Sequence, residues 1–408
     1  TIPSQKDFYS RFVKKLRDKD TKAVVVISDA MRYEVGEELL RRIREQDKFD
    51  AQIEPILASL PSYTQLGMAS LLPHEQLAIS DAEKAVVSIN GNPTSGLENR
   101  KKVLAGNPQG DRTSAWQATD FLELKSIGAK EIIRDHDVLY IYHNVIDATG
   151  DSAKTEEKVF EAAEDALVEL VTLVRKLTSA NAGHIFVTAD HGFIYQNRDL
   201  QESDYLSVKP EGDEIIFQDR RFILGRGLKE HPSFKKFNAS DLALDGDIEV
   251  LIPKSINRLR RKGSGAKYVH GGASLQEVIV PVLKINKGRQ NDTALVDVSI
   301  LTGATKTITT GQLSVRFYQE EAVTEKIQPR KLRLGIYALD GTLLSDTHEL
   351  MFDMTSSNPR DREQKAQLLL SKAADAYNNK EVVMRLDEQH AGTTHFKEYK
   401  STRYTIKR

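Results

Sequence analysis

The stretch "KAVVVISDAMRYEVGEELLRRIREQ", residues 22–46, decides the fold of the first half of the chain. It begins with an apolar, mostly β-branched run that does not alternate, as expected of a strand covered on both faces in a parallel sheet. Asp29 follows this run directly. Apolar residues then recur every four positions, which indicates an amphipathic helix, at Met31, Val35, Leu39 and Ile43. The stretch therefore predicts a strand, an acidic loop and a helix.

The same unit returns further along the chain. Apolar strands are predicted at 51–59, 137–144 and 183–190. A helical pattern begins near Thr64, and a longer one runs from Val159 to Leu177. Strands that alternate with helices in this way indicate an α/β fold, a doubly wound and mostly parallel sheet. In such sheets ligands bind beyond the carboxyl ends of the strands, so we expect the residues that follow the strands to share one edge.

The sequence patterns in the rest of the chain predict two insertions and a second domain. Residues 74–130 contain turn residues without a firm period, which indicates a loop-rich insertion, and 196–267 form a second, mixed insertion. Short strand patterns then follow one another, with one helical stretch at 361–378. We expect an α/β domain over 1–289 and a small β-sandwich-like domain over 290–408.

Composition excludes several classes of protein. The 408 residues carry a net charge of -1 and include no cysteine. This excludes disulfides, thiolate zinc sites and a cysteine nucleophile, and it fits a reducing compartment. No apolar run approaches the length of a membrane span, and the start "TIPSQKDFYSRF" lacks a signal-peptide core. We expect a cytoplasmic, multidomain protein with no membrane partner, or a fragment of one, because the initiator methionine is absent.

Carboxylates, imidazoles and one hydroxyl follow the predicted strands. The candidates are Asp29, Thr64, Asp147, Asp151, Asp190, His191 and His270. Four carboxylates at one sheet edge would repel one another unless cations were present. Two divalent ions would balance the four aspartates while the histidines bind as neutral ligands, which favours a two-metal site over a carboxylate pair that shuttles a proton. Each residue alone also fits an ordinary role, such as a helix cap at Asp29 or a turn around Gly150.

Thr64 supplies a candidate nucleophile. Metal coordination lowers the pKa of a threonine hydroxyl, and a helix N-terminus favours the resulting anion. The alternative is that Ser62 or Thr64 only caps the helix that follows. Gly192 is expected to let the chain turn sharply, so that Asp190 and His191 face one ion.

Five motifs in this order resemble the PglZ domain of the alkaline-phosphatase-like superfamily. They are "ISDAMRYE" (27–34), "LPSYTQLGMASLLP" (60–73), "YIYHNVIDATGD" (140–151), "FVTADHGF" (186–193) and "HGGASLQEVIVP" (270–281). The resemblance spans roughly residues 20–285. The whole chain is similar to the C-terminal portion of PglZ proteins from bacterial BREX phage-defence systems.

The resemblance implies two divalent metal ions and assigns their ligands. One ion would bind Asp29, Asp190, His191 and the Thr64 oxygen; the other would bind Asp147, Asp151 and His270. The superfamily pattern at the second ion is DxxGH, whereas this chain reads DATGD, so Asp151 stands where a histidine is expected. A hard anionic oxygen there is expected either to shift the preference from zinc towards manganese or magnesium or to weaken the second site. Further candidates are His143 as a ligand, with Asn144 and Arg32 as phosphate contacts.

The same resemblance implies phosphoryl transfer by a metal-dependent phosphodiesterase or nuclease in phage defence, with Thr64 attacking the phosphorus. The alternative is a metal-binding scaffold that holds partner proteins of the defence complex, which Asp151 and the second domain suggest. A phosphomutase is disfavoured, because no sugar-phosphate clamp is recognisable. The basic run 257–263 offers a contact to nucleic acid, although a solvated loop is the favoured interpretation.

Overall fold

The computed structural model describes residues 2–79, 85–107, 110–261, 265–288, 292–303, 305–390 and 393–408. The chain divides into two compact units, Thr1–Ile43 with Phe49–Gly288 and Arg44–Lys48 with Arg289–Arg408. The domain boundary predicted between 289 and 290 falls on residues outside those described. Among the described residues, no helix is both long and apolar enough to cross a membrane.

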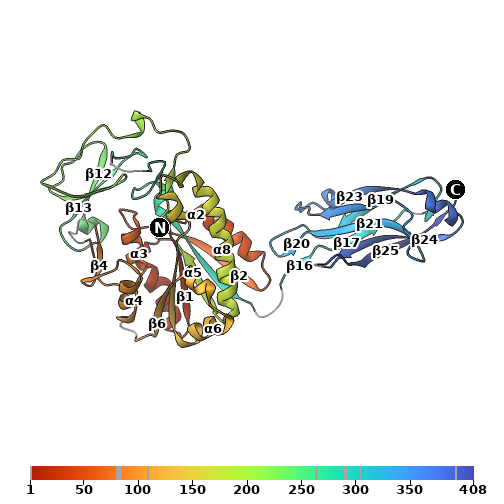
Figure 1. Cartoon of the computed structure of the whole chain (residues 1–408), viewed down its shortest axis with the longest axis horizontal. Helices are drawn as coiled ribbons and strands as arrows, with labels where there is room; N and C mark the ends of the chain where they lie inside the picture. The colour runs from red at the N-terminus through yellow and green to blue at the C-terminus, as the bar shows by residue number, and fades with distance from the viewer. Residues whose placement is uncertain are drawn as a thin grey trace. The chain divides into compact units, whose positions relative to one another are not determined.

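A six-stranded mixed sheet forms the centre of the first unit (Figure 1). Its strands, in spatial order, are β2 (Phe49–Leu57), β15 (Ile279–Lys287), β8 (His184–Thr188), β1 (Ala23–Ser28), β7 (Val138–His143) and β6 (Thr113–Gln117). Strand β15 pairs antiparallel with both β2 and β8, whereas β8, β1, β7 and β6 pair in parallel. Every residue of β1 and β7 is buried, as expected of central strands covered on both faces.

Helices cover both faces of this sheet (Figure 1). The α-helices described in the first unit are α1 (Lys14–Arg17), α2 (Tyr33–Arg44), α3 (Thr64–Ser70), α4 (Leu97–Ala105), α5 (Ala118–Glu123), α6 (Ser126–Asp135), α7 (Ile146–Gly150), α8 (Val159–Ser179) and α9 (Leu275–Val278). Helix α8 buries the predicted apolar face, which includes Leu167, Leu170 and Val174. Helix α6 packs against α8, whereas α3 packs against the short N-terminal helix η1 (Gln5–Asp7).

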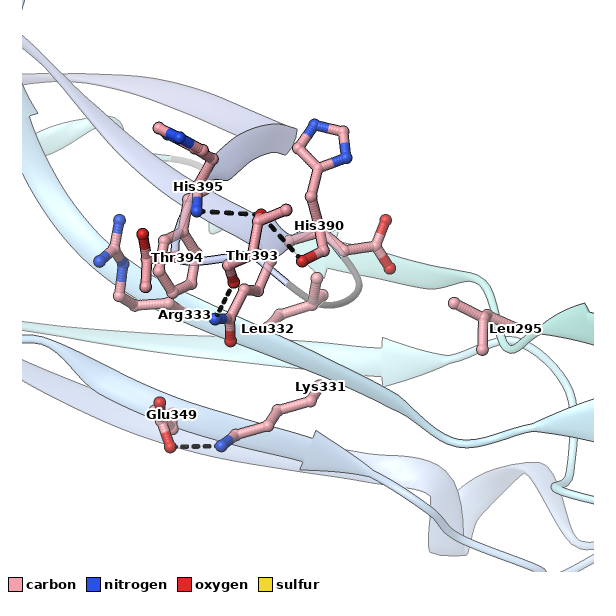
Figure 2. A pocket seen from close by; sticks show the side chains of 12 residues that line it. Leu295, Lys331, Leu332, Arg333, Glu349, His390, Thr393, Thr394 and His395 are labelled. Atoms are coloured by element: carbon pink, nitrogen blue, oxygen red, sulfur yellow. Dashed lines mark hydrogen bonds and ion pairs between the residues drawn. The ribbon is translucent and has the colours of Figure 1, made fainter.

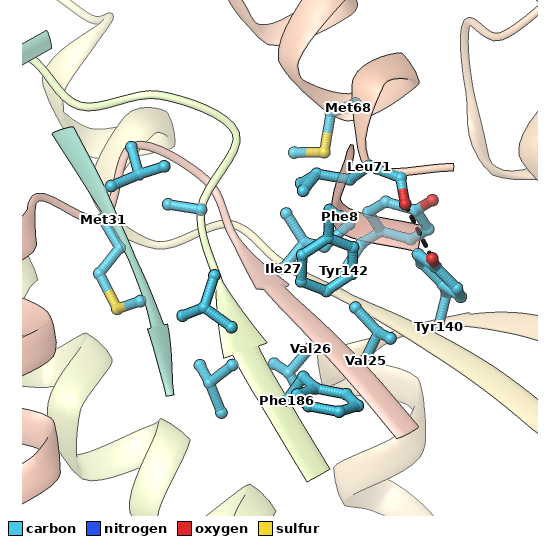
Figure 3. Packing of buried hydrophobic residues seen from close by; sticks show 14 of the residues in the cluster. Phe8, Val25, Val26, Ile27, Met31, Met68, Leu71, Tyr140, Tyr142 and Phe186 are labelled. Atoms are coloured by element: carbon cyan, nitrogen blue, oxygen red, sulfur yellow. Dashed lines mark hydrogen bonds between the residues drawn. The ribbon is translucent and has the colours of Figure 1, made fainter. Parts of the chain in front are cut away.

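The core joins the central strand to the N-terminal segment and to α3 (Figure 3). Val25 and Ile27 of β1 are fully buried, as is Phe8, whose ring meets that of Phe186 edge-on at 6.2 Å. The Tyr140 hydroxyl donates to the Leu71 carbonyl at 2.8 Å. Burying each large apolar side chain contributes about 1.5–3 kcal/mol, so this packing fixes the strand ends relative to α3.

Residues 74–130 are more regular than predicted. They hold a small sheet of β3 (Leu77–Ile79), β4 (Val87–Ile89) and β5 (Asn92–Pro93), together with α4, α5 and α6. Strand β6 pairs in parallel with β7 and forms an edge of the central sheet. The loop-rich prediction was therefore wrong for this part, because the edge strand "TSAWQ" buries only Ala115 and has no apolar run.

The segment from 196 to 267 forms a separate antiparallel sheet of the first unit. Its order is β10 (Glu214–Gln218), β11 (Ile223–Arg226), β13 (Glu249–Pro253) and β12 (Phe234–Asn238). A two-stranded sheet of β9 (Ile194–Tyr195) and β14 (Tyr268–Val269) closes the segment. It brings the two chain ends of the insertion together beside the central sheet's carboxyl edge.

The second unit is built from strands. A three-stranded sheet contains, in spatial order, β17 (Val298–Leu301), β19 (Gln312–Gln319) and β23 (Glu363–Leu369). A five-stranded sheet contains β18 (Thr307–Ile308), β25 (Phe396–Ile406), β24 (Glu381–Gln389), β21 (Arg330–Ala338) and β22 (His348–Phe352). In addition, β16 (Ala294–Leu295) pairs with β20 (Ile327–Gln328). Residues of both larger sheets share one hydrophobic cluster. The sandwich-like arrangement stays a prediction.

The helix predicted at 361–378 was wrong. The segment forms β23, followed by a short 3-10 helix at Lys372–Tyr377. Strand β23 pairs with β19 over seven residues and buries Leu368 in the shared core. Pairing with a neighbouring strand outweighs the helical propensity of the sequence here.

Candidate metal centre

Three adjacent strands of the central sheet deliver the candidate residues to one edge. Asp29 follows β1, Asp190 and His191 follow β8, and Asp147 lies in α7 just after β7. Because β1, β7 and β8 are parallel neighbours, their carboxyl ends meet at the same place. The convergence expected from the strand pattern therefore occurs.

The first group consists of Asp29, Asp190 and His191, whose ligand atoms lie within 4.8 Å of one another. His191 Nε2 lies 3.6 Å from Asp29 Oδ1 and 3.4 Å from Asp190 Oδ2. Asp190 Oδ1 accepts the backbone N–H groups of Ala30 and His191 at 3.1 and 2.9 Å. Asp190 Oδ2 and Asp29 Oδ1 remain buried without a hydrogen-bond partner. Orphaned buried carboxylate oxygens are costly, and a bound cation would satisfy both.

The electrostatics of the first group also fit a cation. Burial, followed by the charges of Asp190 and Asp147, raises the pKa of Asp29 well above its usual value. Burial lowers the pKa of His191, which favours the neutral imidazole that metals bind. His191 Nδ1 lies 3.0 Å from the Gly192 carbonyl and therefore carries the proton, since a carbonyl only accepts. The lone pair of Nε2 is then directed into the group.

Thr64 stands at the first position of α3 and faces this group. Its Oγ1 lies 3.1 Å from His191 Nε2. Tyr63 occupies the N-cap and makes no side-chain cap bond, while Ser62 Oγ donates to the Gly272 carbonyl at 2.7 Å. The capping interpretation of Ser62 and Thr64 was therefore wrong, because both hydroxyls bond to other loops.

The second group consists of Asp147, His191 and His270. The rings of His191 and His270 stack at 4.2 Å with an angle of 13° between their planes, and His270 Nε2 lies 3.9 Å from Asp147 Oδ1. The Tyr268 hydroxyl donates to Asp147 Oδ1 at 2.9 Å. Burial lowers the pKa of His270, but the carboxylates of Asp147, Asp219 and Asp151 outweigh it, so this pKa is raised overall.

Two glycines allow the close approach of these loops. A Cβ on Gly150 would lie 2.5 Å from the Tyr268 ring, and a Cβ on Gly192 would lie 2.1 Å from the Gln276 carbonyl oxygen. Gly192 does not adopt a positive φ. The sharp turn expected at Gly192 therefore stays a prediction, whereas the close approach of the Gln276 backbone gives the glycine a role of its own.

Asp151 lies outside both groups. It is exposed and ends α7, where its N–H donates to the Asp147 carbonyl at 2.8 Å. Although the residue as a whole is exposed, partial desolvation of its carboxyl by neighbouring atoms, followed by the charge of Asp147, raises the pKa of Asp151. It lines a cavity of about 40 Å³ together with Asp219, His270 and Arg261. Asp151 is therefore a neighbour of the second group, and its role as a ligand stays a prediction.

The auxiliary candidates have structural partners of their own. His143 is buried between Ser28 Oγ, 3.0 Å from its Nδ1, and Glu169, 3.3 Å from its Nε2. Asn144 Oδ1 accepts the Ala148 N–H at 2.9 Å and so supports the start of α7. Arg32 pairs with Glu34, and its guanidinium lies 5.1 Å from the Phe193 ring centre. None of these contacts places them in either group.

The described part of the basic run also has partners. Arg258 is buried and donates to the Lys267 carbonyl at 3.0 Å. Arg260 pairs with Glu202, and Arg261 Nη1 lies 2.8 Å from Asp219 Oδ1. Lys262 and Gly263 lie outside the described residues. These ion pairs offset much of the positive charge on which a nucleic-acid contact would depend.

A separate cavity of about 860 Å³ belongs to the second unit (Figure 2). Its polar residues bond largely to one another. Lys331 Nζ lies 2.6 Å from Glu349 Oε2, and the Thr393 hydroxyl donates to the His390 carbonyl at 3.1 Å. None of the residues that line it belongs to either group.

Comparison with known proteins agrees with the motifs. Residues 8–285 match the family described as "BREX system PglZ alkaline phosphatase-like domain". The chain is 40% identical over 381 residues to "Alkaline phosphatase-like protein BrxZ" of Escherichia coli O9:H4 (strain HS), which covers 90% of this chain and 43% of that protein. It is 35% identical over 396 residues to "Alkaline phosphatase-like protein PglZ" of Bacillus cereus (strain H3081.97), which covers 96% of this chain and 46% of that protein.

Among solved structures, phosphonoacetate hydrolase from Sinorhizobium meliloti 1021 aligns with 12% identity and a TM-score of 0.41, over 65% of this chain and 90% of that chain. An identity and a TM-score this low do not indicate a shared activity. The chain spans less than half the length of the two relatives, 43% and 46%. The family match covers well over half of the present chain. The chain therefore belongs to the PglZ family of alkaline-phosphatase-like domains.

Proposed function

We propose that the chain is a metal-dependent phosphodiesterase that transfers a phosphoryl group through Thr64. The observation that carries the proposal is the position of Thr64 Oγ1, 3.1 Å from His191 Nε2 at the edge of the first group. A hydroxyl at a helix start, beside buried carboxylates and imidazoles, matches the demands on an activated nucleophile.

The donor set fits two divalent ions, zinc, manganese or magnesium. Asp29, Asp190 and His191 would hold one ion next to Thr64. Asp147 and His270 would hold the other, with Asp151 as a further ligand from the neighbouring turn. When bound, such ions lower the pKa of a coordinated hydroxyl and offset the charge of phosphate oxygens.

The protein's own groups would then perform a two-step displacement. The Thr64 hydroxyl loses its proton to solvent, and its oxygen bonds to phosphorus while the bond from phosphorus to the leaving oxygen breaks. The leaving oxygen takes a proton from solvent. The intermediate is a phosphodiester between Thr64 and the part of the substrate that stays on phosphorus. Water next attacks phosphorus, the bond from phosphorus to the Thr64 oxygen breaks, and a phosphomonoester leaves while the Thr64 hydroxyl is restored. Asp190, held by two backbone N–H groups, keeps its free oxygen aimed at the reacting centre.

The setting of this activity is part of the proposal. The family description names the BREX system, and we place the chain in phage defence together with the other proteins of that complex. A nucleic acid is a candidate substrate because it carries phosphodiesters.

A metal-binding scaffold is the second candidate. The exposed position of Asp151 outside the second group favours it, because an incompletely held second ion would weaken catalysis. In this case the ions stabilise the fold, and the chain acts by binding its partner proteins.

Hydrolysis of bis(p-nitrophenyl) phosphate with Mn²⁺ or Zn²⁺ separates the two candidates. We expect Thr64→Ala to lose at least about 10³-fold in rate, since removal of a nucleophile costs that much or more. Thr172→Ala, at an exposed position of α8, is the matched control and should retain the wild-type rate. Equal rates for wild type and Thr64→Ala would exclude Thr64 as the nucleophile. A wild type that binds ions without hydrolysis would favour the scaffold.

A further inference from the structure

The side chain of Gln5 is buried against the strand ends that carry the first group. It has no exposed surface and belongs to η1. Gln5 lies 185 positions before Asp190 in the chain. Gln5 Nε2 donates to the carbonyls of Ala189 and Asp190 at 3.0 and 2.7 Å. Gln5 Oε1 accepts the Ser59 N–H at 3.0 Å. One amide thus joins the end of β8 to the loop that leads into α3.

The orientation of this amide is determined by its partners. Two carbonyl oxygens face its nitrogen and one N–H faces its oxygen, so the flipped amide would leave all three bonds unmade. The backbone around Gln5 is itself held: Ser4 caps η1, and the Leu57 N–H donates to the Pro3 carbonyl at 2.8 Å. The bonds of Gln5 therefore act from a fixed position.

The backbone of Asp190 is confined from a second side by α3. A Cβ on Gly67 would lie 2.4 Å from the Asp190 carbonyl oxygen, so the helix touches the backbone atom that Gln5 also binds. Thr64 begins the same helix. The distance between Thr64 and the carboxylate of Asp190 consequently depends on how Asp190 is held between Gln5 and α3.

We propose that Gln5 is a positioning residue that sets the geometry of the first group. It does so by fixing the backbone of Asp190 and the loop at Ser59 that leads into α3 and Thr64. This proposal rests on the proposed function only in taking the first group to bind a divalent ion. Gln5 touches neither Thr64 nor a ligand atom, so it acts through the main chain. Partners outside the ligand shell typically change metal affinity by about 10–100-fold.

Isothermal titration of the metal-free chain with Zn²⁺ or Mn²⁺ tests the proposal, with Gln5→Leu as the variant. Leucine keeps the bulk of the side chain and removes all three bonds. We expect the tighter ion to bind about 10–100-fold more weakly, with the second ion changed less. Gln5→Asn keeps the amide but shortens its reach, and it serves as the second variant if the leucine variant does not fold.

Gln319 offers a matched control in the second unit. It is also fully buried; its Nε2 donates to the carbonyls of Glu321 and Met354 at 2.6 and 2.7 Å, and its Oε1 accepts the Met354 N–H at 3.0 Å. Gln319→Leu should lower the melting temperature by a similar amount and leave metal affinity unchanged. Wild-type affinity in a folded Gln5 variant, or an equal loss in both leucine variants, would overturn the positioning role. A wild type that binds metal without hydrolysis would contradict the proposed phosphodiesterase alone.

Discussion

The two groups at the sheet edge differ in how firmly their residues are held. In the first group the three residues are at most 3% exposed, and the backbone of Asp190 is confined by Gln5 and α3. In the second group Asp147 and His270 are partly exposed, and Asp151 lies on the surface beside them. The difference indicates one preformed position next to Thr64 and one adaptable position. We therefore expect the ions to bind with unequal affinity.

Removing the free oxygen of Asp190 should have the largest effect. Asp190→Asn retains an acceptor for the N–H groups of Ala30 and His191 but replaces Oδ2 with an amide. We expect loss of the tighter ion in titration and at least about 10³-fold slower hydrolysis, because the ion next to Thr64 is lost. Asp340→Asn, at an exposed turn of the second unit, should leave both unchanged. Normal binding of both ions by Asp190→Asn would contradict the assignment.

Crowding the contact between α3 and Asp190 should have the next largest effect. Gly67→Ala places a Cβ 2.4 Å from the Asp190 carbonyl oxygen, so the backbone must shift. We expect a loss of about 1–3 kcal/mol in the free energy of unfolding, measured with urea, and weaker binding of the tighter ion. Gly183→Ala is the control, since nothing lies within 4 Å of its added Cβ. A tighter-ion affinity equal to that of Gly183→Ala would show that this contact is unimportant.

Loosening the second group should affect only the weaker ion. Tyr268→Phe removes the hydroxyl that donates to Asp147 Oδ1 at 2.9 Å and leaves the ring on Gly150. We expect the weaker ion to lose about 10-fold in affinity while the tighter ion is unaffected. Equal losses at both ions would mean that a change at Asp147 reaches the first group through His191, which belongs to both groups.

Changing Asp151 should have the smallest effect. Asp151→His introduces the residue of the superfamily pattern, and imidazole suits zinc better than a carboxylate does. We expect the weaker ion to bind zinc a few-fold more tightly relative to manganese, with no change at the first group. Competition titrations with the two metals measure this ratio. An unchanged ratio would show that Asp151 does not contact the second ion.

The parts of the fold that the sequence predicts are those in which burial is uniform or periodic. The strand at 22–28 and the long helix from Val159 both follow from their apolar patterns, and the residues after the strands meet as expected. Strand β6 was not predicted, because this edge strand buries only one residue and so has no apolar pattern. Strand β23 was predicted as a helix, because its pairing with the distant strand β19 cannot be read from the local pattern.

The contacts that organise the site were harder to predict, because they are long-range. Gln5 reaches Asp190 across 185 positions, and nothing local marks it as a contact of the candidate metal centre. Tyr268 lies only two positions before His270, but its bond to Asp147 depends on the space above Gly150. The sequence signal for a role of Tyr268 at the site was its position close to the candidate ligand His270.

The central claim is that the first group binds a divalent ion beside Thr64. A crystal of the chain soaked with Mn²⁺ or Zn²⁺ and measured at the absorption edge of the metal tests it directly. We expect a strong anomalous peak in contact with Asp29, Asp190 and His191, and a weaker peak near Asp147 and His270. A single peak at the second group, or no peak at either group, would contradict the account.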